Sequence, residues 1–212
     1  MSLTLYFLRH GETTYSQTGR YCGAMNPELT EAGVQMAQAF ADTYQHQTWE
    51  AVYVSPMKRT IATATPLCTA IGQTMQIRDG LKEMQYGTWE DALPGLVKTQ
   101  FLDEYLNWMT EPAWNAPANG ETAVQIATRA MSVIAEIEAA HTHGNVLVVS
   151  HKATIRIILC SLLGIDLGRY RDRIDMPAGA VSVVKFTKFG PMLQRMGDRA
   201  YMDDELRNRE GT

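Results

Sequence analysis

The chain has 212 residues, 45% of them hydrophobic and 20% charged, so it is long enough to bury the core of one large domain. A formal net charge of -4 argues against general binding to nucleic acid or to an anionic membrane, and no apolar run is long enough to cross a bilayer. The N-terminus lacks the basic and apolar regions of a signal peptide. Three scattered cysteines predict neither a disulfide framework nor a thiolate metal site, so a cytoplasmic location is expected.

Short apolar runs typical of buried strands alternate along the chain with segments of helical spacing. The expected strands cover 3–8, 51–54, 75–77, 146–150, 181–186 and 192–196. The expected helices cover 30–44, 55–65, 122–140 and 154–163, the second opening with Ser55 as N-cap and Pro56 at its first position. This alternation predicts an α/β fold, a three-layer α/β/α sandwich around a mostly parallel sheet.

Two segments depart from this regular alternation. Residues 92–119 are rich in tryptophan and proline and contain a short amphipathic stretch, which predicts a cap-like insertion lying over the sheet. Residues 203–212 are charged and predict a mobile, solvated tail. We therefore expect one domain over residues 1–202, with an insertion and a tail.

Basic and imidazole side chains follow three different strands. Arg9 and His10 come directly after the first strand, Arg59 lies in the first turn of the helix after the second, and His151 follows the strand at 146–150. Because ligands of open α/β sheets bind beyond the carboxyl ends of the strands, we expect these four side chains to converge.

Such a cluster suits transfer of a phosphoryl group. A neutral imidazole can attack phosphorus, as predicted for His10, and paired guanidinium donors match the charge on the transferring oxygens. His151, if protonated, would add a donor, and the amides at the starts of the following helices would add others. The leaving oxygen needs a proton, for which Glu83 is the best candidate, although Glu12, Glu90 and Asp91 could compete. Nothing in this chemistry demands a metal, and His141 with His143 reads as a solvated turn rather than a metal pair.

These residues belong to motifs that resemble those of the histidine phosphatase superfamily, the phosphoglycerate mutase-like proteins. The resemblance covers about residues 3–200 and includes, in order, Leu8–Thr13, Gly23, Leu29–Gly33, Ser55–Thr60, Glu83 with Gly87–Glu90, Gly120–Thr122 and Val148–His151. It implies the phosphoglycerate mutase-like fold, a phosphohistidine on His10, a phosphate pocket of Arg9, Arg59 and His151, Glu83 as proton donor, and no cofactor.

Some positions depart from the family pattern or have open roles. Ser16 stands where asparagine is common, so a phosphate contact is expected to be shortened or replaced by water. Lys152 stands where glycine is common and hints at a more anionic substrate. Gly23 is expected at the substrate site, and Arg20 is expected either to support an anionic group or to face solvent.

The segment after Glu83 resembles the phosphatase branch rather than the mutases. Residues 92–119 contain no arginine, and such a cap suits a bisphosphate poorly. The sequence therefore predicts a metal-independent phosphatase for a small phosphorylated metabolite, with no nucleic-acid or membrane partner. A phosphoglycerate-type mutase and a catalytically silent phosphate-binding module remain as alternatives, and a homodimer is compatible with the sequence.

Overall fold

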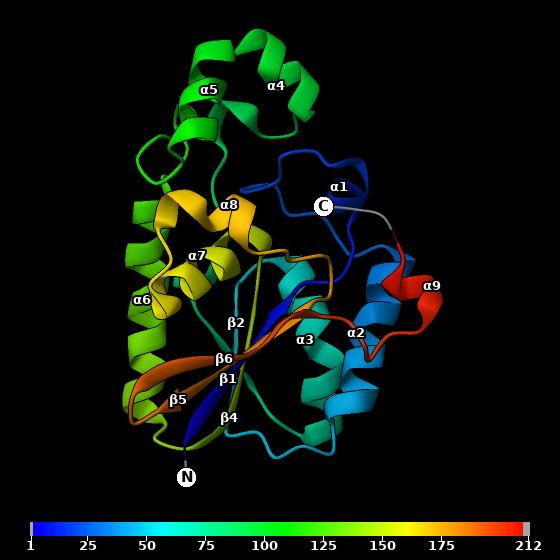
Figure 1. Ribbon diagram of the computed structural model, residues 1–212. Coiled ribbons are helices and arrows are strands. Elements are labelled where there is room, and N and C mark those ends of the chain that lie inside the picture. Colours follow the sequence, from blue (N-terminus) through cyan, green and yellow to red (C-terminus); the bar gives the residue numbers. More distant parts are fainter. Residues whose placement is uncertain (1, 210–212) are drawn as a thin grey trace.

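The computed structural model describes residues 2–209 and shows helices packed on both faces of one six-stranded sheet (Figure 1). The strands are β1 (Leu3–Arg9), β2 (Ala51–Val54), β3 (Met75–Ile77), β4 (Gly144–Ser150), β5 (Val181–Thr187) and β6 (Gly190–Asp198). Their order is β3-β2-β4-β1-β5-β6, with β1 to β4 parallel and β5 antiparallel to both its neighbours. The predicted α/β sandwich with a mostly parallel sheet is confirmed.

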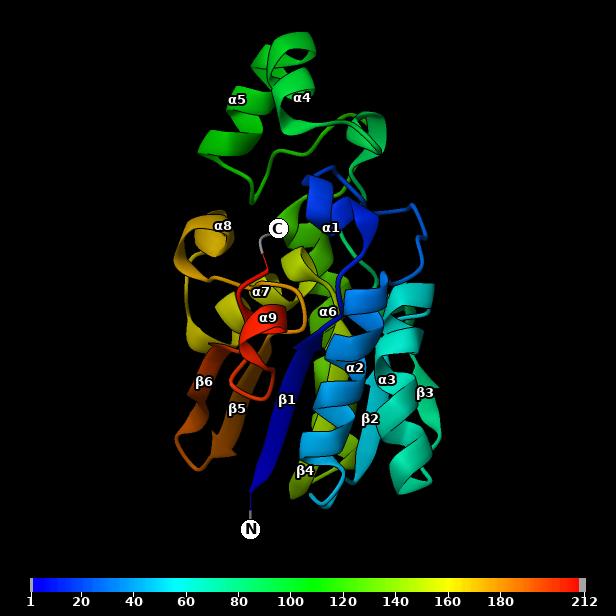
Figure 2. The ribbon, with the colours of Figure 1, turned by 90° about the vertical axis from the view of Figure 1, so that its right-hand side faces the viewer.

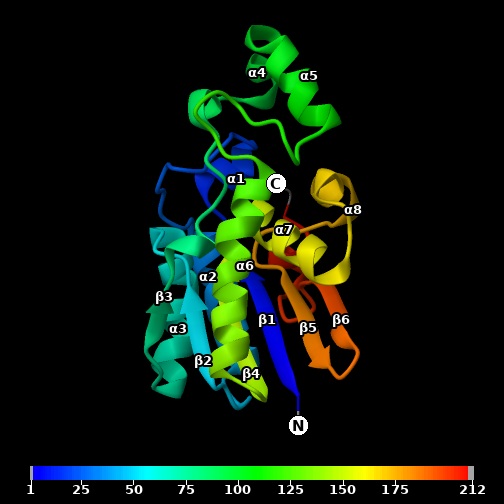
Figure 3. The same cartoon turned by 90° about the vertical axis from the view of Figure 1, so that its left-hand side faces the viewer.

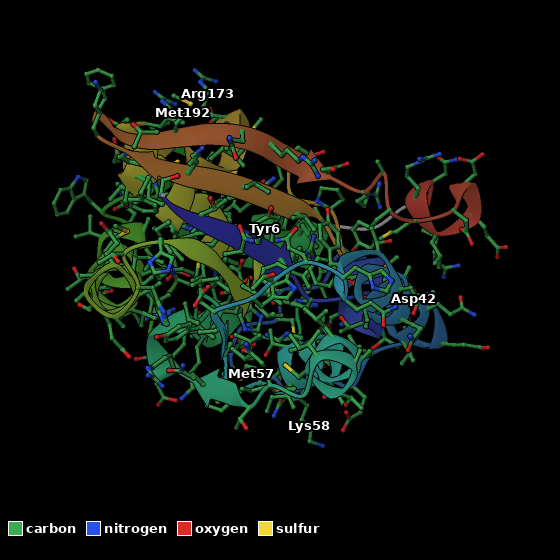
Figure 4. The ribbon with its side chains drawn as sticks, turned by 90° about the horizontal axis from the view of Figure 1, so that it is seen from below. Tyr6, Asp42, Met57, Lys58, Arg173 and Met192 are labelled. Atoms are coloured by element: carbon green, nitrogen blue, oxygen red, sulfur yellow. The ribbon has the colours of Figure 1, made fainter. Side chains whose placement is uncertain are left out.

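Two pairs of long helices cover the sheet. Helices α2 (Glu31–Tyr44) and α3 (Lys58–Ile71) lie on one face, and α6 (Ala123–Ala140) and α7 (Lys152–Leu163) lie on the other (Figures 2 and 4). Successive strand residues point to opposite faces, so Phe7 belongs to the core under α6 and α7, whereas Leu8 belongs to the core under α2 and α3. Both faces are thus buried, which explains the nearly continuous apolar runs in the strands.

Two helices begin at residues other than those predicted. Helix α3 starts at Lys58 with Met57 as its N-cap, and it runs through Pro66 to Ile71 instead of ending at residue 65. Ser55 stays level with the strand ends because its amide donates to the carbonyl of Val149 (3.1 Å). Helix α7 starts at Lys152, two residues earlier than predicted.

The predicted insertion contains α4 (Pro94–Gln100) and α5 (Leu102–Thr110). These helices stand beyond the carboxyl ends of the strands rather than across a face of the sheet (Figure 1). Trp108 of α5 is buried and packs edge-to-face on Trp89, with ring centroids 5.3 Å apart. The insertion is therefore tied by aromatic contacts to the loop that carries Glu83.

The remaining helices are short. They are α1 (Thr14–Thr18), α8 (Tyr170–Arg173), α9 (Asp204–Arg207) and 3₁₀ turns at Asp79–Leu81, Gly87–Trp89 and Leu167–Arg169. Leu206 of α9 is buried in a cluster with Met36 of α2, and Arg209 forms an ion pair with Glu12 (2.9 Å). Residues 203–209 thus make more contacts than a solvated tail would; residues 210–212 lie outside the described part.

The described residues also bear on the compartment and membrane expectations. Cys22, Cys68 and Cys160 are all free thiols. None of the helices within residues 2–209 combines the length and the apolar character needed to cross a bilayer.

Candidate active site

Three strands end at one level and bring the site together. Arg9 of β1 pairs in register with Ser150 of β4, and the amide of His10 donates to the carbonyl of Ser150 (3.1 Å). The loop after β1 packs tightly on the start of α2, where a Cβ on Gly11 would lie 2.4 Å from the carbonyl oxygen of Gly33. Glycine is required there by close backbone approach, which gives these motif glycines a physical role.

His10 is buried and held in one tautomer. Its Nδ1 lies 2.7 Å from the carbonyl oxygen of Gly11, which accepts a hydrogen bond only if Nδ1 carries the proton. Burial and the positive charges of Arg59 and Arg9 hold the pKa of His10 well below 6.5. His10 is therefore a neutral imidazole at physiological pH, with Nε2 as its unprotonated nitrogen.

His151 lies behind Arg59. Its Nδ1 accepts a hydrogen bond from Nε of Arg59 (3.2 Å), so Nε2 carries the proton and donates to the hydroxyl of Ser55 (2.8 Å). Burial and nearby Arg59 lower the pKa of His151 well below 6.5. Among residues 2–209, those lining the cavity do not include His151, so the structure shows a neutral ring that orients Arg59 rather than an imidazolium facing the substrate.

Both predicted arginines are buried and oriented by backbone carbonyls. Arg59 donates from Nη1 to Met25 (2.9 Å), and Arg9 donates from Nη1 to Met176 (2.6 Å). Burial lowers the pKa of Arg9 to about 10, with Glu83 acting in the opposite direction, so its side chain stays charged at neutral pH. Two fixed guanidiniums thus line the same cavity as His10.

The carboxylate of Glu83 sits at the N-terminus of α7. It accepts hydrogen bonds from the amides of Met84 (2.8 Å), Ala153 (3.2 Å) and Thr154 (3.2 Å), and from the Thr154 hydroxyl (3.3 Å). The α7 amides therefore hold this carboxylate, whereas the sequence predicted that they would face the phosphate. At α3, the first amide donates to the side chain of Asn26 (2.8 Å).

The backbone around Glu83 is held by a residue that the sequence did not single out. Arg129 of α6 donates to the carbonyls of Gly80 (2.8 Å), Lys82 (2.8 Å) and Glu83 (3.1 Å), and it pairs with Glu121 (2.8 Å). Only its position on the buried side of a helix could have drawn attention to it, since the contact crosses more than 45 residues.

The competing carboxylates have other partners. Glu90 accepts hydrogen bonds from the amides of Gly23 and Tyr86, and Glu12 is bound by Thr30 and Arg209. Among residues 2–209, Glu83 is the one carboxylate that lines the cavity.

The cavity itself has a volume of about 230 Å³ and contains most of the predicted site residues. Its wall includes Arg9, His10, Ser16, Arg20, Arg59, Glu83 and Lys152, all predicted. It also includes residues that the sequence did not indicate, namely Thr13, Tyr15, Gly19, Tyr21, Cys22, Tyr86, Pro94, Trp108, Ala153, Arg156, Tyr170 and Arg171. The size suits a small phosphate ester.

Three predicted binding residues have mainly structural contacts here. The Ser16 hydroxyl donates to the carbonyl of Thr13 and accepts from its amide (both 2.9 Å), which caps α1. Gly23 lies outside the cavity wall, and a Cβ there would meet the carbonyl oxygen of Met84 at 1.9 Å. Arg20 lines the cavity, but its guanidinium donates to the Asp91 carbonyl (2.5 Å) and lies 3.5 Å from the Asp91 carboxylate.

The cavity wall also contains two arginines that lie outside the insertion of residues 92–119. Arg156 lies one turn beyond Lys152 on α7, and Arg171 of α8 stacks over the ring of Trp108, 3.5 Å from its centroid. The cavity beneath the insertion is therefore more positively charged than the lack of arginine in residues 92–119 suggests. The i, i+4 spacing of Lys152 and Arg156 after His151 was the signal available in the sequence.

Comparisons with known proteins agree with this geometry. The sequence pattern of the "Histidine phosphatase superfamily (branch 1)" matches residues 5–199. The chain is 30% identical over 166 residues to phosphoserine phosphatase 1 of Hydrogenobacter thermophilus, covering 78% of this chain and 79% of the relative. It is 27% identical over 199 residues to the adenosylcobalamin/alpha-ribazole phosphatase of Escherichia coli, covering 93% and 97%.

A solved structure supports the same fold. Bacillus stearothermophilus YhfR superposes with a TM-score of 0.88 at 22% identity, covering 95% of this chain and 100% of that one. The match over residues 5–199 spans β2 to β6, β1 from its third residue on, and the whole cluster around His10. The chain belongs to branch 1 of the histidine phosphatase superfamily.

Proposed function

We propose that the protein hydrolyses small phosphate monoesters through a phosphohistidine on His10, without a metal. The observation that carries this is the neutral His10 ring, whose Nδ1 is fixed on Gly11 while the ring lines a cavity walled by Arg9, Arg59 and Glu83. One nitrogen is thereby available for attack, and two guanidiniums flank it to bind the transferring phosphoryl group.

The reaction proceeds in two balanced steps. Nε2 of His10 attacks phosphorus, the bond from phosphorus to the ester oxygen breaks, and Glu83 gives a proton to the leaving oxygen. Water then attacks the phosphohistidine, Glu83 takes the proton from that water, and the bond between phosphorus and nitrogen breaks to release phosphate and neutral His10. The hydrogen bonds from Ala153 and Thr154 hold Glu83 in position throughout.

Hydrolysis is favoured over isomerisation because the named relatives are phosphatases. A mutase built on the same residues would return the phosphoryl group to the substrate. The two activities differ in whether isomer exchange outruns phosphate release, which can be measured directly with a labelled phosphate ester.

The test is phosphate release from a panel of small phosphate esters with EDTA present, comparing the wild type with His10→Ala. His143→Ala is the matched control, because His143 is an exposed histidine at the opposite end of β4. We expect chelator-resistant release that is lost in His10→Ala and kept in His143→Ala. Release that survives His10→Ala, or that stops with EDTA, would contradict the proposal.

The role of Glu83 is tested by the leaving group. p-Nitrophenolate leaves without a proton, whereas an alkoxide does not. Glu83→Gln should therefore slow formation of the phosphoenzyme much more from an alkyl phosphate than from p-nitrophenyl phosphate, as measured by rapid quench. Equal losses for both esters would mean that Glu83 is not the proton donor.

A further inference from the structure

The cations around the cavity exceed what a single phosphate needs. Six cationic side chains line it, and among residues 2–209 they face one carboxylate, that of Glu83. Of these, Arg9 and Arg59 flank His10, and Arg20 is engaged by Asp91. Three cations from α7 and α8 remain, and we refer to Lys152, Arg156 and Arg171 as the α7–α8 cation cluster.

The cluster has one ion pair among residues 2–209, a long one to an exposed carboxylate. Within residues 2–209, Lys152 and Arg171 form no ion pair, and Nε of Arg156 is buried without a hydrogen-bond partner. The nearest acid, Asp175, lies 3.9 Å from Arg156 and has a side chain that is 90% exposed. The three side chains are half-buried on the cavity wall, and cations gathered there with so little carboxylate pairing indicate an anionic ligand.

The cluster lies on the leaving-group side of the cavity. Lys152 directly precedes Ala153, whose amide holds the Glu83 carboxylate, and Glu83 is the proposed donor to the leaving oxygen. Arg156 is four residues further along α7, roughly 6 Å at the helical rise per residue. Helix α8 lies between α7 and the cap helix α5 (Figures 1 and 3), and Arg171 of α8 stacks on Trp108 of α5.

The guanidinium of Arg171 is oriented by its contacts with the cap. The Arg171 guanidinium stacks on Trp108 and donates from Nη1 to Sδ of Met109 (2.9 Å). Stacking leaves other N–H groups in the guanidinium plane, where they can meet a carboxylate through paired hydrogen bonds. Burial and the charges of Arg9 and Arg156 lower the pKa of Lys152 to about 7, and a bound anion would raise it again.

We propose that the α7–α8 cation cluster binds a carboxylate on the leaving group, so that the preferred substrates are small phosphate monoesters of carboxylic acids. This inference rests on the proposed phosphatase function.

The test compares 3-phosphoglycerate with glycerol 3-phosphate, which share a three-carbon chain and differ in the carboxylate. The wild type should favour 3-phosphoglycerate in kcat/KM. Lys152→Met and Arg171→Met should each lower kcat/KM for 3-phosphoglycerate about tenfold, the usual cost of losing one charged hydrogen bond. Both should affect glycerol 3-phosphate turnover and inhibition by inorganic phosphate several-fold less, because neither readout involves the carboxylate.

The chain offers a matched control for each variant. Arg173→Met removes an arginine of the same helix α8 that extends outward near β6, and Lys58→Met removes an exposed lysine at the first position of α3, as Lys152 is of α7 (Figure 4). Both controls should behave as the wild type with both esters. Equal loss in the Lys152 and Lys58 variants would assign the effect to general surface charge and overturn the inference.

Other outcomes separate this inference from the function on which it rests. Turnover that depends on His10 but shows no preference for 3-phosphoglycerate would overturn the carboxylate site and leave the phosphatase standing. A preference for propanediol bisphosphate over 3-phosphoglycerate would assign the cluster to a second phosphate instead. No turnover of any ester that depends on His10 would overturn both.

Discussion

The cavity has two ends that are built in different ways. Arg9, His10 and Arg59 form what we call the phosphate end, and Lys152, Arg156 and Arg171 form the leaving-group end. At the phosphate end, the side chains are held by protein partners: Gly11 holds His10, and both His151 and Met25 hold Arg59. At the leaving-group end, Lys152 and Arg171 form no ion pair with residues 2–209. The phosphate group is common to all monoesters, so fixed donors can be oriented for it in advance, which lowers the cost of binding its transition state. The leaving group differs from one ester to another, and cations without an ion-pair partner in the protein can pair with an anionic group of the bound ester.

The two ends also differ in the secondary-structure elements that supply their residues. The phosphate end is built at the ends of β1, β2 and β4, whose backbone positions are set by the register of the sheet. The leaving-group end is built by α7, α8 and the cap, where Arg171 of α8 meets Trp108 and Met109 of α5 through its side chain. Side chains of the second arrangement can therefore be exchanged without altering the pairing of the strands.

After the loss of activity expected for His10→Ala, the largest effect is expected from Arg59→Lys. A lysine has one charged nitrogen and cannot bond His151, Met25 and a phosphate together, so kcat/KM with p-nitrophenyl phosphate should fall about a thousandfold. Arg173→Lys, on the outer side of α8, should have no effect. If the Arg59 variant kept most of its activity, the phosphate end would not depend on a fixed guanidinium.

The buried histidines should make the protein sensitive to acid. In the unfolded chain, His10 and His151 take up protons near pH 6.5, whereas their folded pKa values lie well below it. The free energy of unfolding should therefore be fully present above pH 6.5 and fall as the pH drops below it. Each histidine contributes up to about 1.4 kcal/mol per pH unit.

Urea unfolding at several pH values would measure this slope. His151→Gln should make it shallower, whereas the exposed His143→Gln should not. An unchanged slope in the His151 variant would show that this ring gains a proton in the folded protein.

A smaller effect is expected from Ser55→Ala. Without the hydroxyl, Nε2–H of His151 loses its acceptor, so the ring no longer fixes Nε of Arg59. We expect kcat to fall about tenfold, the value of one buried hydrogen bond, with KM nearly unchanged. Ser161→Ala, which removes a hydroxyl bonded to the carbonyl of Ile157, should leave kcat as it is; the same loss in both variants would indicate a general loss of stability.

The smallest effect is expected in how KM for 3-phosphoglycerate depends on pH. The pKa of Lys152 is lowered to about 7 by burial, Arg9 and Arg156, against the opposing charges of Asp175 and Glu83. Lys152 therefore loses its charge as the pH rises through 7, and KM for 3-phosphoglycerate should rise several-fold above it. Lys152→Arg should flatten this dependence, and glycerol 3-phosphate should not show it; a rise in KM for both esters would contradict the assignment.

Much of the phosphate end could be predicted from the sequence. Arg9, Arg59 and Glu83 were found because a parallel sheet brings the residues after its strands to one edge. His151 was placed correctly in the chain, but its orientation was not, because that depends on the donor Nε of Arg59 and on the Ser55 hydroxyl across two loops. The sequence predicts Ser55 as a helix cap, since serine before proline is a common helix start, but Met57 caps α3 and Ser55 bonds His151.

The sequence by itself determined the order of strands and helices and the residues that directly follow each strand. Both are local properties of apolar periodicity and chain position. Only the tertiary structure decided that Arg129 supports Glu83, that α7 amides hold its carboxylate, and that Arg171 rests on Trp108. These contacts join elements far apart in the chain, and they depend on how helices pack at their ends. Apolar periodicity sets which face of a helix is buried but not which polar side chain meets which partner.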